Sequence, residues 1–185
     1  AAANLLPDDA EAAWKEVEKA LTPPPPPKGR ISFSHAADPC RPVPTPDLPS
    51  DYPRVTVLGV TVAWPPGDAP LPEPTGFAYM VVGILEEAAL LTGTPRRAET
   101  TVIVYATNEH FHALSHAPSW ADGLYSGAVH LPAFPTRDLG VKLATLRHEL
   151  MHAQLHSAVG CMPLWFNEGL AMRFGGRAPR QEWMK

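Results

Sequence analysis

The residues with the clearest capacity for chemistry form the segment His148-Glu149-Leu150-Met151-His152, an H-E-x-x-H pattern. Residues four apart in a helix lie on the same face, so His148 and His152 can offer two imidazole nitrogens to one metal ion. Glu149 lies beside that face, close enough to reach a water molecule at the metal without being a ligand itself. The pattern therefore predicts a metal site with an adjacent acid for proton transfer.

A third candidate ligand, Glu168, lies in the segment PLWFNEGLA (163–171), which predicts a second helix. The break at Gly160 lets this helix fold back antiparallel against the first, and we expect Gly169 to permit close approach of the two backbones. Two histidines and one carboxylate leave zinc one open position for water, as in catalytic rather than structural sites. The alternative is a solvated surface acid, which the apolar neighbours of Glu168 disfavour.

Periodicity and turn residues predict the elements that position these side chains. The expected order is a strand, a buried helix, a strand, a short helix, a strand and two final helices, at residues 54–63, 77–92, 100–106, 108–114, 125–131, 140–157 and 163–174. In the helix over 140–157, one side is apolar and expected to be buried: Leu143, Leu146, Leu150 and Ala153. This order predicts an α+β fold in one domain.

The two motifs together resemble those of the gluzincin clan of zinc metallopeptidases. HELMH and the glutamate of WFNEGLA are most similar to the compact bacterial "peptidase MA-like" domains, and TVIVYATNEHFHAL and DGLYSGAVHLP are similar to the segments that precede H-E-x-x-H there. The likeness covers roughly residues 54–174. It implies a small zincin-like domain within 51–185, with a mixed twisted sheet, a buried backing helix, an active-site helix, a glutamate helix and a possible C-terminal truncation.

The resemblance also assigns roles to individual residues. It implies that His148, His152 and Glu168 bind Zn²⁺, and that Glu149 is the catalytic general base and acid in the hydrolysis of peptide bonds. It further implies that the strand around 126–130 is the sheet edge along which an extended peptide or protein substrate lies. His130, within that strand, is a candidate to face the substrate groove.

Two departures from the family pattern bear on activity. No tyrosine or histidine follows Glu168 to stabilise the transition state, and His156 is weighed as either such a donor or a residue at the rim of the cleft. Met172 stands where an acid often supports the first histidine. The alternative function is therefore a catalytically attenuated, zinc-binding peptide-recognition domain of a larger envelope protein.

The first fifty residues lie outside the resemblance. Residues 8–21 (DDAEAAWKEVEKAL) predict a helix within 1–21, which ends where five consecutive prolines begin. Ten of the 28 residues in 22–49 are proline, so the segment 22–50 is expected to be an extended linker or arm.

Composition bounds the partners. The chain has 185 residues, enough for one domain and a tail, and a formal net charge of −4 with no basic stripe. Binding to nucleic acid is not expected, because the sequence has no cluster of lysine and arginine residues to neutralise phosphates. The apolar runs are shorter than the ~20 residues of a membrane span, so no transmembrane segment is expected. The oligomeric state stays open.

Two cysteines, Cys40 and Cys161, are too few for a disulfide scaffold. They can form one bridge, remain separate thiols, or place the Cys40 thiolate on the open position of the zinc to keep the enzyme latent. The chain begins with Ala1 and without a signal region, so we expect any targeting segment to have been removed. A secreted or cell-envelope location is the corresponding expectation.

Overall fold

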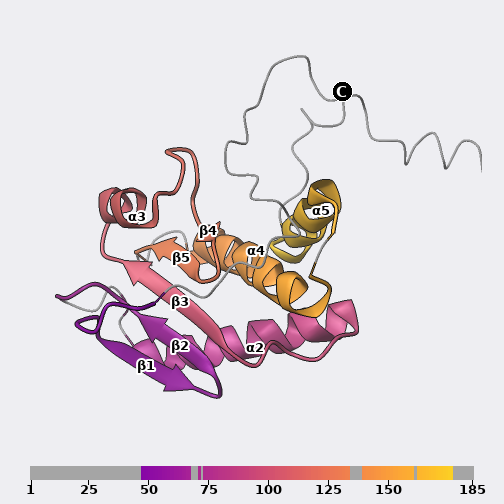
Figure 1. The fold of residues 1–185 in the computed structure, drawn as a ribbon, viewed down its shortest axis with the longest axis horizontal. Helices are drawn as coiled ribbons and strands as arrows, with labels where there is room; N and C mark the ends of the chain where they lie inside the picture. The colour runs from indigo at the N-terminus through magenta and orange to yellow at the C-terminus, as the bar shows by residue number, and fades with distance from the viewer. Residues whose placement is uncertain (1–46, 68–70, 72, 134–138, 161, 177–185) are drawn as a thin grey trace, which may run out of the picture. The chain divides into compact units, whose positions relative to one another are not determined.

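The computed structural model describes residues 47–67, 71, 73–133, 139–160 and 162–176. These residues form a five-stranded mixed sheet and four helices, which confirms the α+β class (Figure 1). The predicted helix within 1–21 and the arm up to residue 46 lie outside the described residues, as do Cys40 and Cys161.

The first predicted strand, 54–63, is two strands. β1 (Arg54–Val57) and β2 (Val60–Ala63) pair antiparallel around Leu58 and Gly59, whose φ angles are 48° and 84°. A Cβ atom at Gly59 would lie 2.0 Å from the carbonyl oxygen of Ala98, so only glycine fits this turn. Val and Thr alternate on both sides of Leu58 and Gly59, so the segment resembles one strand although the phase of the alternation changes at the turn.

The predicted strand 125–131 is likewise a hairpin. β4 (Leu124–Tyr125) pairs antiparallel with β5 (Val129–Pro132), and the amide of Ser126 donates to the carbonyl of Ala128 at 2.9 Å in the turn between them. The strand order β1-β2-β3-β5-β4 places β5 beside β3 (Thr100–Tyr105), in the interior of the sheet. The expectation that 126–130 forms the sheet edge is therefore wrong, and β4 is the edge strand on this side of the sheet.

The helix α2 (Pro74–Thr92) covers one face of the sheet. Glu73 caps its first turn by accepting from two backbone amides, and Gly93 ends it in the left-handed conformation. Its buried residues share a core with the side chains of β2 and β3 that point to the same face. Among the described helices, α2 is the one long and apolar enough to cross a membrane by length and composition, although a buried core helix has the same properties.

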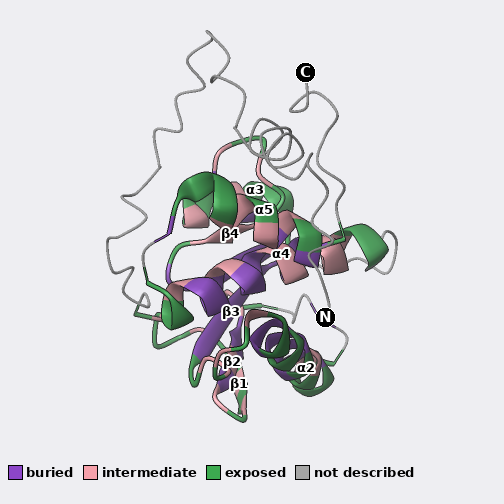
Figure 2. Ribbon diagram, turned by 90° about the vertical axis from the view of Figure 1, so that its right-hand side faces the viewer, coloured by how far each residue is buried: buried purple, intermediate pink, exposed green. Residues whose placement is uncertain are grey.

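The last two helices, α4 (Leu139–Ala158) and α5 (Leu164–Phe174), pack against each other. The apolar side of α4 joins the core shared with α2 and the sheet. The short helix α3 (Asn108–Ser115) contributes Phe111 to a smaller core on the other face of the sheet. Figure 2 shows that buried residues gather on the strands and on the inner side of α2. The α4–α5 pair carries the candidate site.

Candidate metal centre

The predicted burial of the apolar side of α4 is confirmed. Leu146, Leu150 and Ala153 are fully buried on the core side, and Leu143 packs against the same core. This packing fixes the rotation of the helix about its axis, so the histidines project away from the core. The side chain of His148 is 15% exposed, which leaves the site accessible at its rim.

The three predicted ligands come together. The Nε2 atoms of His148 and His152 lie 3.0 Å apart, and each lies 3.5 Å from one carboxylate oxygen of Glu168. Ligand atoms at zinc distances of 2.0–2.2 Å in a tetrahedron are separated by about 3.3–3.6 Å. The two histidine–glutamate spacings of 3.5 Å fall in this range, and the histidine–histidine spacing of 3.0 Å is slightly shorter, so a small separation of the two rings would accommodate one shared ion. Among the described residues, these three form the one group of metal-ligating side chains within such reach.

Glu168 is held in its charged form by the site itself. Burial alone would raise its pKa, but a hydrogen bond from His148 and the nearby imidazole of His152 bring the pKa below its ordinary value. The carboxylate is thus available as an anionic ligand at neutral pH. Two imidazole nitrogens and a carboxylate are a donor set that zinc prefers, and the residues present therefore fit the metal.

The two histidines differ in their outer partners. The Nδ1 atom of His152 lies 2.9 Å from Oδ1 of Asn167, a contact that fixes the tautomer with Nε2 free for a metal. The Nδ1 atom of His148 is buried without a hydrogen-bond partner among the described residues. Met172 supplies no acceptor at the position noted in the sequence. Asn167 was missed there, although it directly precedes the predicted ligand.

Glu149 lies beside the ligands and under the loop that enters β4. It is only 8% exposed. A Cβ atom at Gly123 would lie 3.1 Å from Cγ and 3.3 Å from Oε1 of Glu149, and 2.6 Å from Cγ2 of Thr145. The glycine therefore keeps space for the glutamate side chain. The sequence offered no signal for this contact beyond a glycine at the start of a predicted strand.

The glycine that brings α4 and α5 close together is not Gly169. An added Cβ atom at Gly169 meets nothing within 4 Å, so the expected close approach there is wrong. At Gly175 such an atom would lie 2.8 Å from the carbonyl oxygen of Ala144 and 3.4 Å from Cβ of His148. The tight contact is at Gly175, directly after the carboxyl end of α5.

Arg147, next to the first histidine, ties three helices together. Its Nε donates to the carbonyl of Phe174 at 2.9 Å, and its terminal nitrogens bind both carboxylate oxygens of Glu87 on α2 at 2.6 and 2.7 Å. The guanidinium also lies over the Phe174 ring, 4.2 Å from its centre. Hydrogen bonds from Arg147 lower the pKa of Glu87. This connection was not predicted from the sequence.

His130 does not face a substrate groove. It is 7% exposed, with Nδ1 2.9 Å from the hydroxyl of Tyr105 and Nε2 3.1 Å from the hydroxyl of Ser126. Burial lowers its pKa to about 4, so the ring is neutral at pH 7. It is a structural residue of the smaller core.

Comparison with known protein families, with curated proteins and with solved structures finds no match to this chain. The interpretation of the site therefore rests on its geometry and on the two sequence motifs.

Proposed function

We propose that this chain is a zinc-dependent peptidase of the gluzincin type, with a zincin-like fold, that hydrolyses peptide bonds in an extended peptide or protein. The observation that carries the proposal is the convergence of His148, His152 and Glu168 within 3.0–3.5 Å of one another. The neighbouring acid Glu149 distinguishes this arrangement from a purely structural metal site.

The chemistry divides between the metal and the chain. When bound, zinc polarises the scissile carbonyl and lowers the pKa of a water molecule toward ~7. Glu149 accepts the proton of the attacking water and later delivers it to the leaving amine. Its burial against Gly123 limits the rotamers that the Glu149 side chain can adopt.

The substrate strand belongs beside β4. Among the strands that the structure describes, β4 pairs with β5 alone, so its other edge has backbone groups able to pair with an extended peptide. The Gly123 contact with Glu149 sets the amino end of β4 next to the proposed base. A peptide paired there would run alongside the helix that carries two of the ligands.

The test is the substitution Glu149→Gln. We expect the variant to bind zinc like the wild type and to lose peptide hydrolysis by about 10²–10⁴-fold, because glutamine has no basic oxygen to accept the proton. The measurements are metal content by elemental analysis and cleavage of a peptide mixture with and without chelator. The control is Glu86→Gln, which changes an exposed glutamate on α2. Unchanged hydrolysis in the Glu149→Gln variant would refute the mechanism.

The second candidate is a zinc-binding peptide-recognition domain with attenuated catalysis. The Nδ1 atom of His148, which has no hydrogen-bond partner within the described ranges, favours it, because a ligand without an outer partner is a weaker base and is held less firmly. The two candidates differ in turnover. A zinc-loaded wild-type protein that binds peptides but leaves them intact would establish the second.

A further inference from the structure

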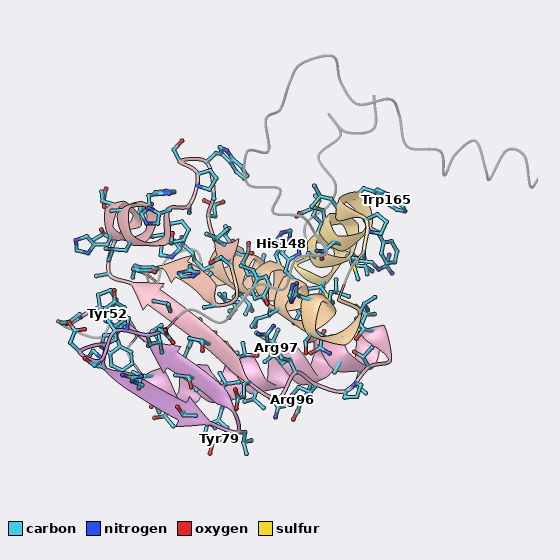
Figure 3. All side chains as sticks on the ribbon, in the orientation of Figure 1. Tyr52, Tyr79, Arg96, Arg97, His148 and Trp165 are labelled. Atoms are coloured by element: carbon cyan, nitrogen blue, oxygen red, sulfur yellow. The ribbon has the colours of Figure 1, made fainter. Side chains whose placement is uncertain are left out.

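Arg97 joins three parts of the fold around the candidate site. It lies in the loop between α2 and β3, and Figure 3 labels it. Its NH1 atom donates to the hydroxyl of Tyr125 on β4 at 2.7 Å and to the carbonyl of Ala153 on α4 at 3.0 Å. Its Nε donates to the carbonyl of Glu99 at 2.7 Å, which holds the guanidinium plane in place.

The loop that carries Arg97 is itself fastened to α4. Gln154 is fully buried, and its amide nitrogen donates to the hydroxyl of Thr94 at 2.9 Å and to the carbonyl of Pro95 at 2.8 Å. Its amide oxygen accepts from the backbone N–H of Arg97 at 2.9 Å. The backbone of Arg97 is therefore fixed to α4, and its guanidinium group reaches the edge strand.

The edge strand needs such a connection. β4 has two residues and, in the described part of the chain, one neighbouring strand, so few backbone hydrogen bonds hold it. Tyr125 adds side-chain contacts: its ring centre lies 5.8 Å from the guanidinium carbon of Arg97 and 6.0 Å from the ring centre of His156 on α4. The Gly123–Glu149 contact lies at the amino end of β4. The contacts of Tyr125 lie further along α4 and fix the carboxyl end of β4.

We propose that Arg97 is a positioning residue that fixes the edge strand β4 at a set distance from the metal-binding helix α4. A peptide paired with β4 is thereby placed in register with the proposed base and ligands. The inference rests on the proposed function, because it assigns the substrate to the edge of β4. The metal ligands are supported separately, by Asn167 and by Arg147. Loss of Arg97 should therefore weaken substrate binding and leave metal binding intact.

The experiment compares Arg97→Ala, Arg97→Lys and Tyr125→Phe in the zinc-loaded chain. The matched control is Arg96→Ala. Arg96 is the adjacent cation, and its side chain donates to the backbone carbonyls of Leu58 in the β1–β2 turn at 3.0 Å and of Arg97 at 3.2 Å. The measurements are zinc content, hydrogen exchange of backbone amides in 121–131, and KM and kcat for the decapeptide that the wild type cleaves best from a library.

For Arg97→Ala we expect unchanged zinc content and amide exchange in 121–131 about tenfold faster. We expect KM to be about tenfold higher and kcat to stay within about twofold, because the variant loses a charge-assisted hydrogen bond. Arg97→Lys should recover part of the loss, because it keeps the charge without the fork of donors. Tyr125→Phe should cause a smaller increase in KM and add nothing to Arg97→Ala.

Two results would overturn the proposal. One is that Arg97→Ala and Arg96→Ala have the same rate of amide exchange in 121–131 and the same KM. The other is a loss of zinc in Arg97→Ala, which would mean that Arg97 stabilises the fold as a whole rather than the position of β4. If the wild type hydrolyses no peptide, the proposed function fails, and the exchange measurement still decides whether Arg97 fixes β4. Tyr125→Phe serves the same purpose if Arg97→Ala does not fold.

Discussion

At the scale of single residues, Gly123 controls the space available to Glu149. A Cβ atom there would overlap side-chain atoms of Glu149 and Thr145, and no backbone atom lies within its three nearest neighbours. Side chains can move where backbone cannot, so an alanine would displace Thr145, and Glu149 by a smaller amount, rather than unfold the domain. The φ angle of Gly123 is not positive, so alanine can adopt the backbone conformation of this residue.

We therefore predict that Gly123→Ala lowers kcat by about tenfold to a hundredfold, the effect typical of a misplaced catalytic group, with zinc affinity unchanged. The measurements are steady-state kinetics and zinc titration. The control is Gly83→Ala on α2, where an added Cβ atom meets nothing within 4 Å. Equal kinetics in the two variants would show that Gly123 does not set the position of the base.

At the scale of elements, the position of α5 depends on Arg147. The carbonyl of Phe174 ends α5, and the hydrogen bond from Arg147 satisfies it while the positive charge offsets the helix dipole. Because α5 carries Glu168, we predict that Arg147→Met weakens zinc binding by about tenfold without changing a ligand. Competition with a chromophoric chelator measures this. Wild-type zinc affinity in the variant would contradict the role.

The partner Glu87 supplies the control for this effect. Glu87→Gln breaks the ion pair and keeps the Arg147–Phe174 bond, so zinc affinity should not change. The Glu87 side chain is 55% exposed, so the pair should stabilise the fold by no more than ~1 kcal/mol. Arg147 holds the pKa of Glu87 below 4.5, so this contribution is complete above pH 4.5 and is lost as the pH falls through the lowered value.

The sequence predicted the helices of this fold better than its strands. Helix ends depend on local signals, such as the cap at Glu73 and the break at Gly93, and the observed α2, α3, α4 and α5 agree with the predicted ranges within a few residues. Both missed hairpins turn at a residue followed by glycine, Leu58–Gly59 and Ser126–Gly127, within segments that are otherwise mostly apolar or β-branched. The reversal at Leu58–Gly59 depends on the approach of Ala98, which is distant in the sequence.

The same distinction applies to the site. His148 and His152 were predictable because a helix sets their spacing, and Glu168 because a turn returns the chain to the same place. The supporting contacts join residues that are far apart in the sequence. Arg147 and Glu87 are separated by 60 positions, and Arg97 and Tyr125 by 28 positions. No local pattern records such pairs.

At the scale of the whole molecule, the metal should contribute to stability as well as to chemistry. The three ligands come from two helices, so an ion bound between them holds α5 against α4. A ligand that binds only the folded state stabilises it by about 2.7 kcal/mol at a concentration one hundred times its Kd. For a chain of this size that corresponds to an increase in Tm of about 5–10 °C.

We predict that zinc raises the Tm of the metal-free protein by this amount and that a chelator reverses the increase, as measured by differential scanning calorimetry. Magnesium should have no effect, because it prefers oxygen ligands in an octahedron. Glu168→Gln should lose most of the zinc-dependent increase, since it removes the one anionic ligand that joins α5 to α4, whereas Glu149→Gln should keep it because Glu149 is not a ligand. Equal Tm values with and without zinc, or an equal response in both variants, would mean that the three side chains do not hold a common ion.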